Sequence, residues 1–145
     1  MPIRKAKQDD LVRIAEMEVF NYRLNFYPIF RDDGFYFEEL QVPKVARNYE
    51  SALDSLWVYD DGVVKGFTQV EDGEVKKLFV EPALQGQSIG AKLLEFAVAE
   101  LDARTLWALE KNEKAIAFYK RHGFRPTGNR KPEEDTAEFL IRLAR

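Results

Sequence analysis

Two Asp-Gly pairs in the middle of the chain constrain its fold more than any other feature. Asp61-Gly62 and Asp72-Gly73 each separate short runs that are rich in β-branched and aromatic residues. Glycine tolerates the positive φ that tight hairpin turns require, so each pair predicts a two-residue turn between antiparallel strands. We therefore expect an antiparallel meander, with strands at 55–59, 63–70 and 74–80.

The segment after the meander predicts a crossover to a parallel strand. Pro82 follows the third strand, and apolar residues between Ile89 and Leu101 recur at the spacing of one helix face. The run TLWALE at 105–110 then has the composition of a short strand. Because a helix separates the two strands, 105–110 should lie parallel to 74–80 through a right-handed crossover.

The N-terminal part predicts helices that pack on this centre. Residues 1–6 have the character of a short first strand. Apolar spacing predicts a helix over 8–26, a loop at 27–34, and a second helical region at 37–53 that is interrupted near Pro43.

The C-terminal part predicts one helix and two strands. Asn112 is placed to cap a helix over 113–122, and Gly123 to end it in the left-handed conformation. Strands are expected at 124–127 and 138–143. The elements together give an α/β (α+β) fold, in which a mixed, mostly antiparallel central sheet is flanked by helices.

Length, charge and residue content exclude several classes of protein. The chain has 145 residues, the size of one domain, and a formal net charge of −3, without the basic excess typical of nucleic-acid-binding proteins. It has no cysteine and one histidine, His122, which excludes disulfides, thiolate chemistry and multi-histidine metal sites. No apolar run is long enough to span a membrane, and the N-terminus lacks a signal-peptide core. We therefore expect a cytoplasmic protein that binds no metal, no nucleic acid and no membrane.

The loop between strand 74–80 and the next helix has the layout of an anion site. The first turn of a helix has unpaired N–H groups and the positive end of the helix dipole, which favour phosphate. Three residues separate Gly86 from Gly90, and Ala91 precedes Lys92, so the spacing of a Walker loop is not met. A dinucleotide fingerprint needs three glycines, and only two are present.

Two motifs occur in order along the chain. The first, VKKLFVEPALQGQSIGAKLL, includes Leu78-Phe79-Val80, Pro82, Gln85 and Gly90. The second, NEKAIAFYKRHGF, has the pattern N-x-x-A-x-x-F-Y-x-x-x-G-F. Together, with a helix and a strand between them, they resemble the GNAT superfamily of acyl-CoA N-acyltransferases over roughly residues 63–124.

This resemblance implies a single N-acetyltransferase domain over 1–145, with a parallel, splayed strand pair at the coenzyme site. Such an enzyme would move an acetyl group from acetyl-CoA directly to a primary amine in a ternary complex. The Val80 N–H would face the thioester oxygen, Tyr119 would protonate the leaving thiolate, and Asn112 would contact the coenzyme as well as cap its helix. The residues expected to bind the coenzyme are Leu78, Phe79, Val80, Gln85, Gly86, Gln87, Ser88, Ile89, Gly90, Ala91, Asn112, Phe118 and Tyr119.

Ser88 departs from the family pattern, because glycine usually occupies this position. Its β-carbon would crowd the phosphates, or its hydroxyl would donate a hydrogen bond to one of them. The sequence leaves both interpretations open.

The base and the acceptor are less determined than the coenzyme site. Glu74 resembles the position of a carboxylate base in some family members, and a solvated hairpin charge is the alternative. The aromatic stretch 18–37 would help to line the acceptor pocket, with Asp32 or Asp33 attracting a cationic amine. The acceptor stays open between small molecules and proteins, and the resemblance is compatible with a homodimer.

Two other functions also stay open. One is a non-catalytic module of the same fold that senses acyl-CoA or binds a protein partner. The other is a different enzyme that uses the loop to bind a nucleotide.

Overall fold

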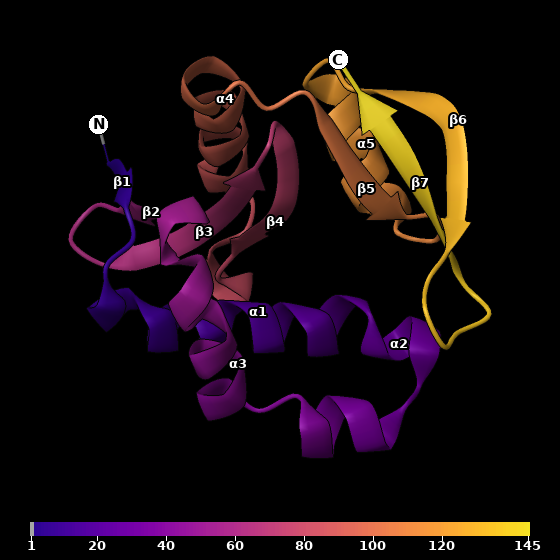
Figure 1. Cartoon of the computed structure of the whole chain (residues 1–145), viewed down its shortest axis with the longest axis horizontal. Helices are drawn as coiled ribbons and strands as arrows, with labels where there is room; N and C mark the ends of the chain where they lie inside the picture. Colours follow the sequence, from indigo (N-terminus) through magenta and orange to yellow (C-terminus); the bar gives the residue numbers. More distant parts are fainter. Residues whose placement is uncertain (1) are drawn as a thin grey trace.

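A twisted sheet with one parallel strand pair forms the centre of the computed structural model, which describes residues 2–145. The strands are β1 (Ile3–Lys5), β2 (Leu56–Asp60), β3 (Val64–Glu71), β4 (Glu74–Val80), β5 (Thr105–Leu109), β6 (Arg125–Pro132) and β7 (Phe139–Ala144). Their spatial order is β1-β2-β3-β4-β5-β7-β6, and only β4 and β5 are parallel neighbours (Figure 1). The mixed, mostly antiparallel sheet predicted from the sequence is confirmed.

Helices pack against both faces of this sheet. They are α1 (Leu11–Asn25), α2 (Tyr27–Phe30), α3 (Val42–Tyr49), α4 (Ile89–Leu101) and α5 (Glu113–Arg121), with short helical turns at Gln8–Asp10, Gly34–Glu39, Glu50–Ser55 and Pro82–Leu84. α1 and α3 share a core with β2 and β3, in which Ile14 and Phe67 are fully buried. α4 and α5 share a second core with β4 and β5, which includes Leu94 and Leu106. The central strands of the sheet are therefore covered by helices, with α1 and α3 in one core and α4 and α5 in the other.

The two predicted hairpin turns differ in length. Asp72 and Gly73 both have positive φ, 50° and 77°, and they alone connect β3 to β4, as expected. The first connection is longer than expected: residues 61–63 join β2 to β3, and the register shifts between Tyr59 and Asp60. The prediction of a two-residue turn was therefore wrong there.

β4 carries an irregularity that shapes the centre of the molecule. Opposite β3, Lys77 pairs with Gln69 and Val75 with Val70, which leaves Lys76 as an extra residue on β4. Such a β-bulge bends its strand and weakens the local pairing.

The bulge coincides with the point where β4 leaves β5. The parallel pairing consists of Glu74 with Thr105 and Val75 with Leu106, and it stops there. Beyond it the two strands diverge, as Figure 1 shows. The main chain of residues 76–80 consequently has no neighbouring strand on its β5 side.

Pro43 begins a helix rather than interrupting one. It lies in the first turn of α3, where the N–H that proline lacks would have no helical partner in any case. The expected region 37–53 accordingly divides into Gly34–Glu39 and α3, followed by Glu50–Ser55. The stretch 27–34, predicted as a loop, contains the one-turn helix α2.

β6 is longer than predicted, and its composition explains why. Every residue of RPTGNRKP at 125–132 is exposed, so the strand shows none of the apolar alternation that marks a half-buried strand. Its pairing with β7 alone holds it in the sheet. Across residues 2–145, no helix is both long and apolar enough to cross a bilayer.

Candidate active site

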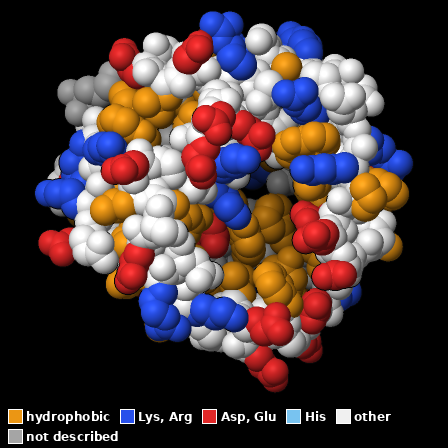
Figure 2. Space-filling model, viewed as in Figure 1, with side chains coloured by type: hydrophobic (Ala, Val, Ile, Leu, Met, Phe, Trp, Pro, Cys, Tyr) orange, Lys and Arg blue, Asp and Glu red, His pale blue; other side chains and the backbone are white. Residues whose placement is uncertain are grey.

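The diverging ends of β4 and β5 open into a cavity of about 770 Å³. Its wall comes from β4 and β5, from the loop that leads into α4, from α5, and from α1. Figure 2 shows a hollow on this face, with hydrophobic side chains inside it and charged side chains around its rim. The two sequence motifs therefore meet around one cavity, although they lie far apart along the chain.

Most of the site residues predicted from the sequence line this cavity. Two of them do not: Gln87 is exposed on the loop, and Glu74 lies where β4 still pairs with β5. The predicted residues that the structure brings together are Leu78, Phe79, Val80, Gln85, Gly86, Ser88, Ile89, Gly90, Ala91, Asn112, Phe118 and Tyr119.

The main chain of Val80 points into the cavity. The next amide, that of Glu81, donates to the Lys65 carbonyl oxygen on β3 at 2.9 Å. Because successive peptide groups of a strand point to opposite sides, the Val80 N–H is directed away from β3 and toward the opening. A donor in this position can stabilise negative charge on a ligand oxygen.

Asn21 lines the cavity, although neither sequence motif indicates it. It is almost fully buried on α1, and its Nδ2 donates to the Val80 carbonyl oxygen at 2.9 Å. Its Oδ1 accepts a hydrogen bond from Gln85 Nε2 at 3.2 Å. One side chain thus ties α1 to the end of β4 and to the loop. The available signal was an amide at core spacing, three residues after Glu18 on an otherwise apolar helix face.

The start of α4 has free hydrogen-bond donors. Ser88 occupies the N-cap position, and its side chain makes no capping hydrogen bond. The N–H groups of 89–91 lie in the first turn, where no carbonyl of the helix can accept them. A β-carbon on Gly90 would lie 3.6 Å from Val80 Cγ2 and 3.7 Å from Phe118 Cζ, so β4, α4 and α5 converge here. Donors and dipole at this mouth suit a diphosphate.

Tyr119 projects from α5 into the same cavity. Its ring centroid lies 5.3 Å from that of Phe118 and 6.1 Å from that of Phe124, so the ring is held by packing. Burial raises the pKa of Tyr119 to about 12. The phenol therefore keeps its proton at neutral pH and can act as a proton donor.

Comparison with known families bears directly on this arrangement. The family model described as an acetyltransferase (GNAT) domain matches residues 52–126, just over half of the chain. The chain belongs to the GNAT acetyltransferase family. The matched residues include β4, the loop, α4 and α5, which form most of the cavity wall.

Individual GNAT proteins show similarity of different extent. The peptidyl-lysine N-acetyltransferase YjaB of Salmonella typhimurium is 36% identical over 75 residues, which are 50% of this chain and 52% of that protein. The alignment thus spans about half the length of this curated relative. An uncharacterized N-acetyltransferase of Archaeoglobus fulgidus is 32% identical over 145 residues, and the match covers 86% of this chain and 93% of that one.

A solved structure extends the likeness to the whole fold. The PaiA N-acetyltransferase of Thermoplasma acidophilum, in complex with coenzyme A, has a TM-score of 0.63 at 20% identity, and the match covers 99% of this chain and 98% of that one. At this identity the likeness concerns the GNAT fold.

Ser88, at the position where the family pattern has glycine, adopts a left-handed backbone conformation. Its φ of 65° and ψ of 13° lie in the left-handed region, which costs a residue with a β-carbon about 1 kcal/mol. We expect Ser88→Gly to raise the free energy of unfolding by up to about 1 kcal/mol, because glycine adopts this conformation without the steric cost. Urea unfolding measures the change.

Ser88→Ala is the matched control for that substitution. Alanine removes the hydroxyl but keeps the β-carbon, so it should give no gain in stability. An equal gain in both variants would show that the hydroxyl, and not backbone strain, is unfavourable. Coenzyme A titrations of the same variants distinguish a crowding β-carbon, which only glycine relieves, from a donating hydroxyl, which both variants lose.

The second motif also positions the end of α5. Asn112 Oδ1 accepts a hydrogen bond from the Ala115 N–H at 3.3 Å, so the predicted cap is confirmed. Gly123 has a φ of 93°, as expected for a left-handed residue after a helix. His122 packs its ring on Phe118, with the centroids 4.8 Å apart.

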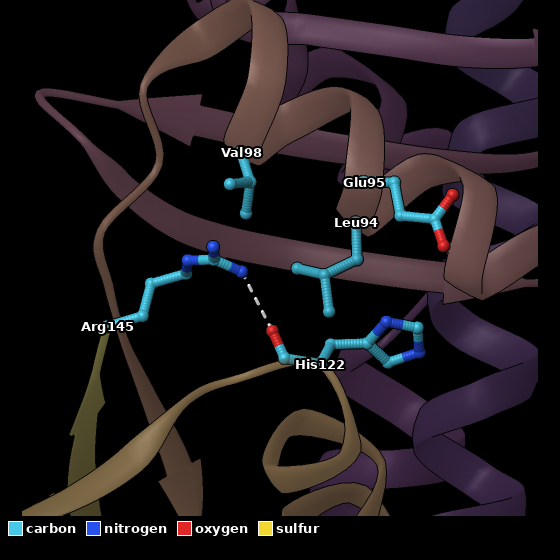
Figure 3. Close-up of a pocket in the computed structure, with 5 residues that line it drawn as sticks. All are labelled: Leu94, Glu95, Val98, His122 and Arg145. Atoms are coloured by element: carbon cyan, nitrogen blue, oxygen red, sulfur yellow. Dashed lines mark hydrogen bonds between the residues drawn. The ribbon is translucent and has the colours of Figure 1, made fainter.

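A separate, small cavity lies beside this end of α5. Its volume is about 140 Å³, and Figure 3 shows the Arg145 guanidinium donating to the His122 carbonyl oxygen at 2.9 Å. The contact anchors the end of α5 to the C-terminal residue. The residues that line this cavity are Leu94, Glu95, Val98, His122 and Arg145.

The carboxylates considered for the acceptor side lie elsewhere. Glu74 Oε2 is 3.2 Å from Lys76 Nζ, at the paired end of β4, so the structure does not bring it together with Tyr119. Asp32 Oδ1 accepts from the Phe35 N–H at 3.1 Å, and Asp33 accepts from the Tyr27 hydroxyl. Neither aspartate lines the cavity, so the expectation that they attract the amine finds no support.

Within 18–37, only part of the aromatic stretch reaches the site. Tyr22, Phe26 and Phe30 line the cavity, whereas Tyr36 is buried in the core and Phe37 is exposed. Among residues 2–145, no group of three or more histidine, aspartate or glutamate side chains lies together in a way that could hold a metal ion.

Proposed function

We propose that this GNAT protein is an N-acetyltransferase that moves an acetyl group from acetyl-CoA directly to a primary amine in a ternary complex. The observation that carries the proposal is the divergence of β4 from β5 beside the inward-pointing N–H of Val80. The unpaired main chain of 76–80 offers an extended ligand the same hydrogen bonds that a neighbouring strand would receive.

The residues around the opening fit the parts of the coenzyme. The first turn of α4 has uncapped N–H groups for a diphosphate, and Gly86 has a φ of 86° with open space where a β-carbon would project. The exposed edge of β4 then leads inward beside Leu78 and Val80. Acetyl-CoA supplies an acetyl group activated as a thioester.

Two groups of this chain would assist the transfer. The Val80 N–H would donate to the carbonyl oxygen of the thioester, where negative charge develops as the amine attacks. Tyr119 would give its proton to the sulfur that leaves, and its raised pKa keeps that proton available at neutral pH. Asn21 would hold the main chain of Val80 in place through the Val80 carbonyl oxygen, next to its N–H.

Direct transfer agrees with the residue content of the chain. Transfer through an acylated enzyme would require a nucleophile, and cysteine, the most readily acylated side chain, is absent from the sequence. This agrees with an amine that attacks the thioester itself while both substrates are bound.

Calorimetry with coenzyme A and thiol-release kinetics with acetyl-CoA test the proposal together. We expect saturable binding of coenzyme A, and thiol release that depends on an amine from a panel of amino acids, polyamines, aminoglycosides and peptides. Binding with no release across the panel would indicate a non-catalytic acyl-CoA sensor. Thermal stabilisation by ATP or NAD, with none by coenzyme A, would indicate an enzyme that uses the loop for a nucleotide.

A further inference from the structure

A lysine from β4 lies in the wall of the cavity on the α1 side. Lys77 Nζ forms a hydrogen bond with the Tyr22 hydroxyl and lies 3.5 Å from Glu18 Oε1, both on α1. Burial by itself would lower the pKa of Lys77, but the Tyr22 hydroxyl and the Glu18 carboxylate outweigh it and raise this pKa. Lys77 is therefore a fixed cation and not a neutral nucleophile.

The stability of the fold gives little reason for this ion pair. The side chain of Glu18 is 9% exposed, and that of Lys77 is 30% exposed. The free energy that is lost when two such charges leave water is about as large as the free energy gained from their attraction. Apolar residues of similar size often give a fold that is equally stable. The Tyr49 hydroxyl donates a further hydrogen bond to Glu18 and holds the carboxylate in place.

The ammonium of Lys77 retains capacity to bind a ligand. An ammonium has three N–H donors, and Tyr22 and Glu18 account for two of them. Lys77 and Tyr22 both line the cavity, so the remaining donor is available on that side. The other lining cations lie elsewhere: Lys76 pairs with Glu74, and Lys114 and Arg121 lie on α5, beside the expected coenzyme.

The connection between β6 and β7 supplies an opposite charge. Glu133 lines the same cavity, and its carboxylate makes no ion pair or hydrogen bond with the other described residues. Its charge contributes to raising the pKa of Tyr22, after burial and Glu18, so it lies within electrostatic range of the hydroxyl that contacts Lys77. The acceptor side therefore has an anchored cation, a free carboxylate, and apolar surface from Phe26 and Phe30.

We propose that the acceptor is a free apolar amino acid whose carboxylate binds Lys77 and Tyr22 and whose amino group approaches from the side of Glu133. This inference rests on the proposed N-acetyltransferase function. A lysine side chain or an N-terminus within a protein has no free carboxylate beside its amine, so it would leave Lys77 unmatched. A doubly charged phosphate is usually bound by several cationic or amide donors. This side of the cavity has one ammonium, which suits a singly charged carboxylate better.

The transfer that this arrangement supports is balanced. The deprotonated amine nitrogen forms a C–N bond to the acetyl carbon, and the C–S bond of the thioester breaks. Tyr119 gives its proton to the sulfur and regains one from the nitrogen through solvent, and a second proton is lost when the ammonium is first deprotonated. The products are an N-acetylated amino acid and free coenzyme A.

Thiol release by the wild-type chain with three probes tests the inference without any substitution. The probes are phenylalanine, phenylalaninamide and 2-phenylethylamine, which share the amine and the ring and differ in the carboxylate. We expect kcat/KM for phenylalanine to exceed that for the other two by about tenfold or more, since a hydrogen-bonded charge is at stake. Equal values, or a preference for the amide, would overturn the proposed acceptor and leave the acetyltransferase function intact. No thiol release with these probes or with any amine of the wider panel would overturn both the proposed acceptor and the proposed acetyltransferase function.

Variants then locate the preference. Lys77→Met combined with Glu18→Gln removes both charges together, so neither charge is left unpaired. In this double variant the ratio of kcat/KM for phenylalanine to that for its amide should fall to about one. Lys65→Gln, which removes a lysine paired with Asp61 outside the cavity lining, should keep the preference. Glu133→Gln should raise KM for phenylalanine and its amide alike. Retention of the full preference in the double variant would overturn the assignment of Lys77.

Discussion

Tyr119→Phe should lower kcat for thiol release by about 10²-fold or more and leave the Kd for coenzyme A unchanged. Phenylalanine keeps the ring that packs between Phe118 and Phe124, so only the proton donor is lost. Stopped-flow thiol detection gives kcat, and calorimetry gives the Kd. A kcat equal to that of the wild type would remove Tyr119 from the mechanism.

Tyr59→Phe is the matched control for this experiment. Tyr59 is a buried tyrosine on β2 that lies outside the cavity lining, so its hydroxyl should not affect kcat. A pH profile adds a second readout. The pKa of Tyr119 is raised to about 12, so the phenol stays protonated as the pH rises. At any pH up to about 10, kcat should therefore not fall through ionisation of Tyr119. A fall in kcat near pH 8 that disappears in Tyr119→Phe would contradict the raised pKa.

The loop and the helix on one side of the cavity could be predicted from the sequence because their signals are local. Two glycines and a helix start indicate the loop at 85–91, and the second motif places Asn112 and Tyr119 on one helix. The single parallel strand pair follows from the strand–helix–strand order. These features need no knowledge of distant contacts.

The acceptor side could not be predicted in the same way, because it depends on pairings between segments far apart. Lys77 is one of two adjacent lysines on β4, and the bulge at Lys76 decides which of them faces α1. No local pattern reveals such a bulge. The position of Glu18 on an apolar helix face indicates that its carboxylate has a partner, because a buried charge needs one. The sequence does not show which residue that partner is.

The full length of the polar edge strand β6 also depends on contacts between distant segments. The sequence predicts the start of β6 as a strand at 124–127, but the exposed residues that follow show no apolar alternation, and they lead to Glu133 at the cavity. The sequence predicts a break in a helix at Pro43, whereas proline equally suits the first turn of a helix, which is where it lies in α3. For β6, pairing with β7 decided a structure that local preference left open.

A double-mutant cycle on Glu18 and Lys77 should show strong coupling in the free energy of unfolding. Glu18→Gln keeps an acceptor for the Tyr49 hydroxyl but leaves the ammonium of Lys77 without its carboxylate, and Lys77→Met leaves the mostly buried carboxylate without its cation. Each single substitution should cost about 2–3 kcal/mol, somewhat below the usual range for a broken buried pair because Lys77 is 30% exposed. The double variant should lose about 1 kcal/mol or less, since both charges are then absent.

Urea unfolding of the four proteins measures this coupling, with Lys65→Gln as a control on an exposed ion pair that should change stability by less than about 1 kcal/mol. A loss in the double variant equal to the sum of the single losses would mean that the two charges act independently. The cycle also separates the two roles that Lys77 could have. If the double variant is as stable as the wild type but no longer distinguishes phenylalanine from its amide, the pair stabilises a bound acceptor and not the fold. A buried charge pair that adds nothing to stability is then explained by the ligand that it positions.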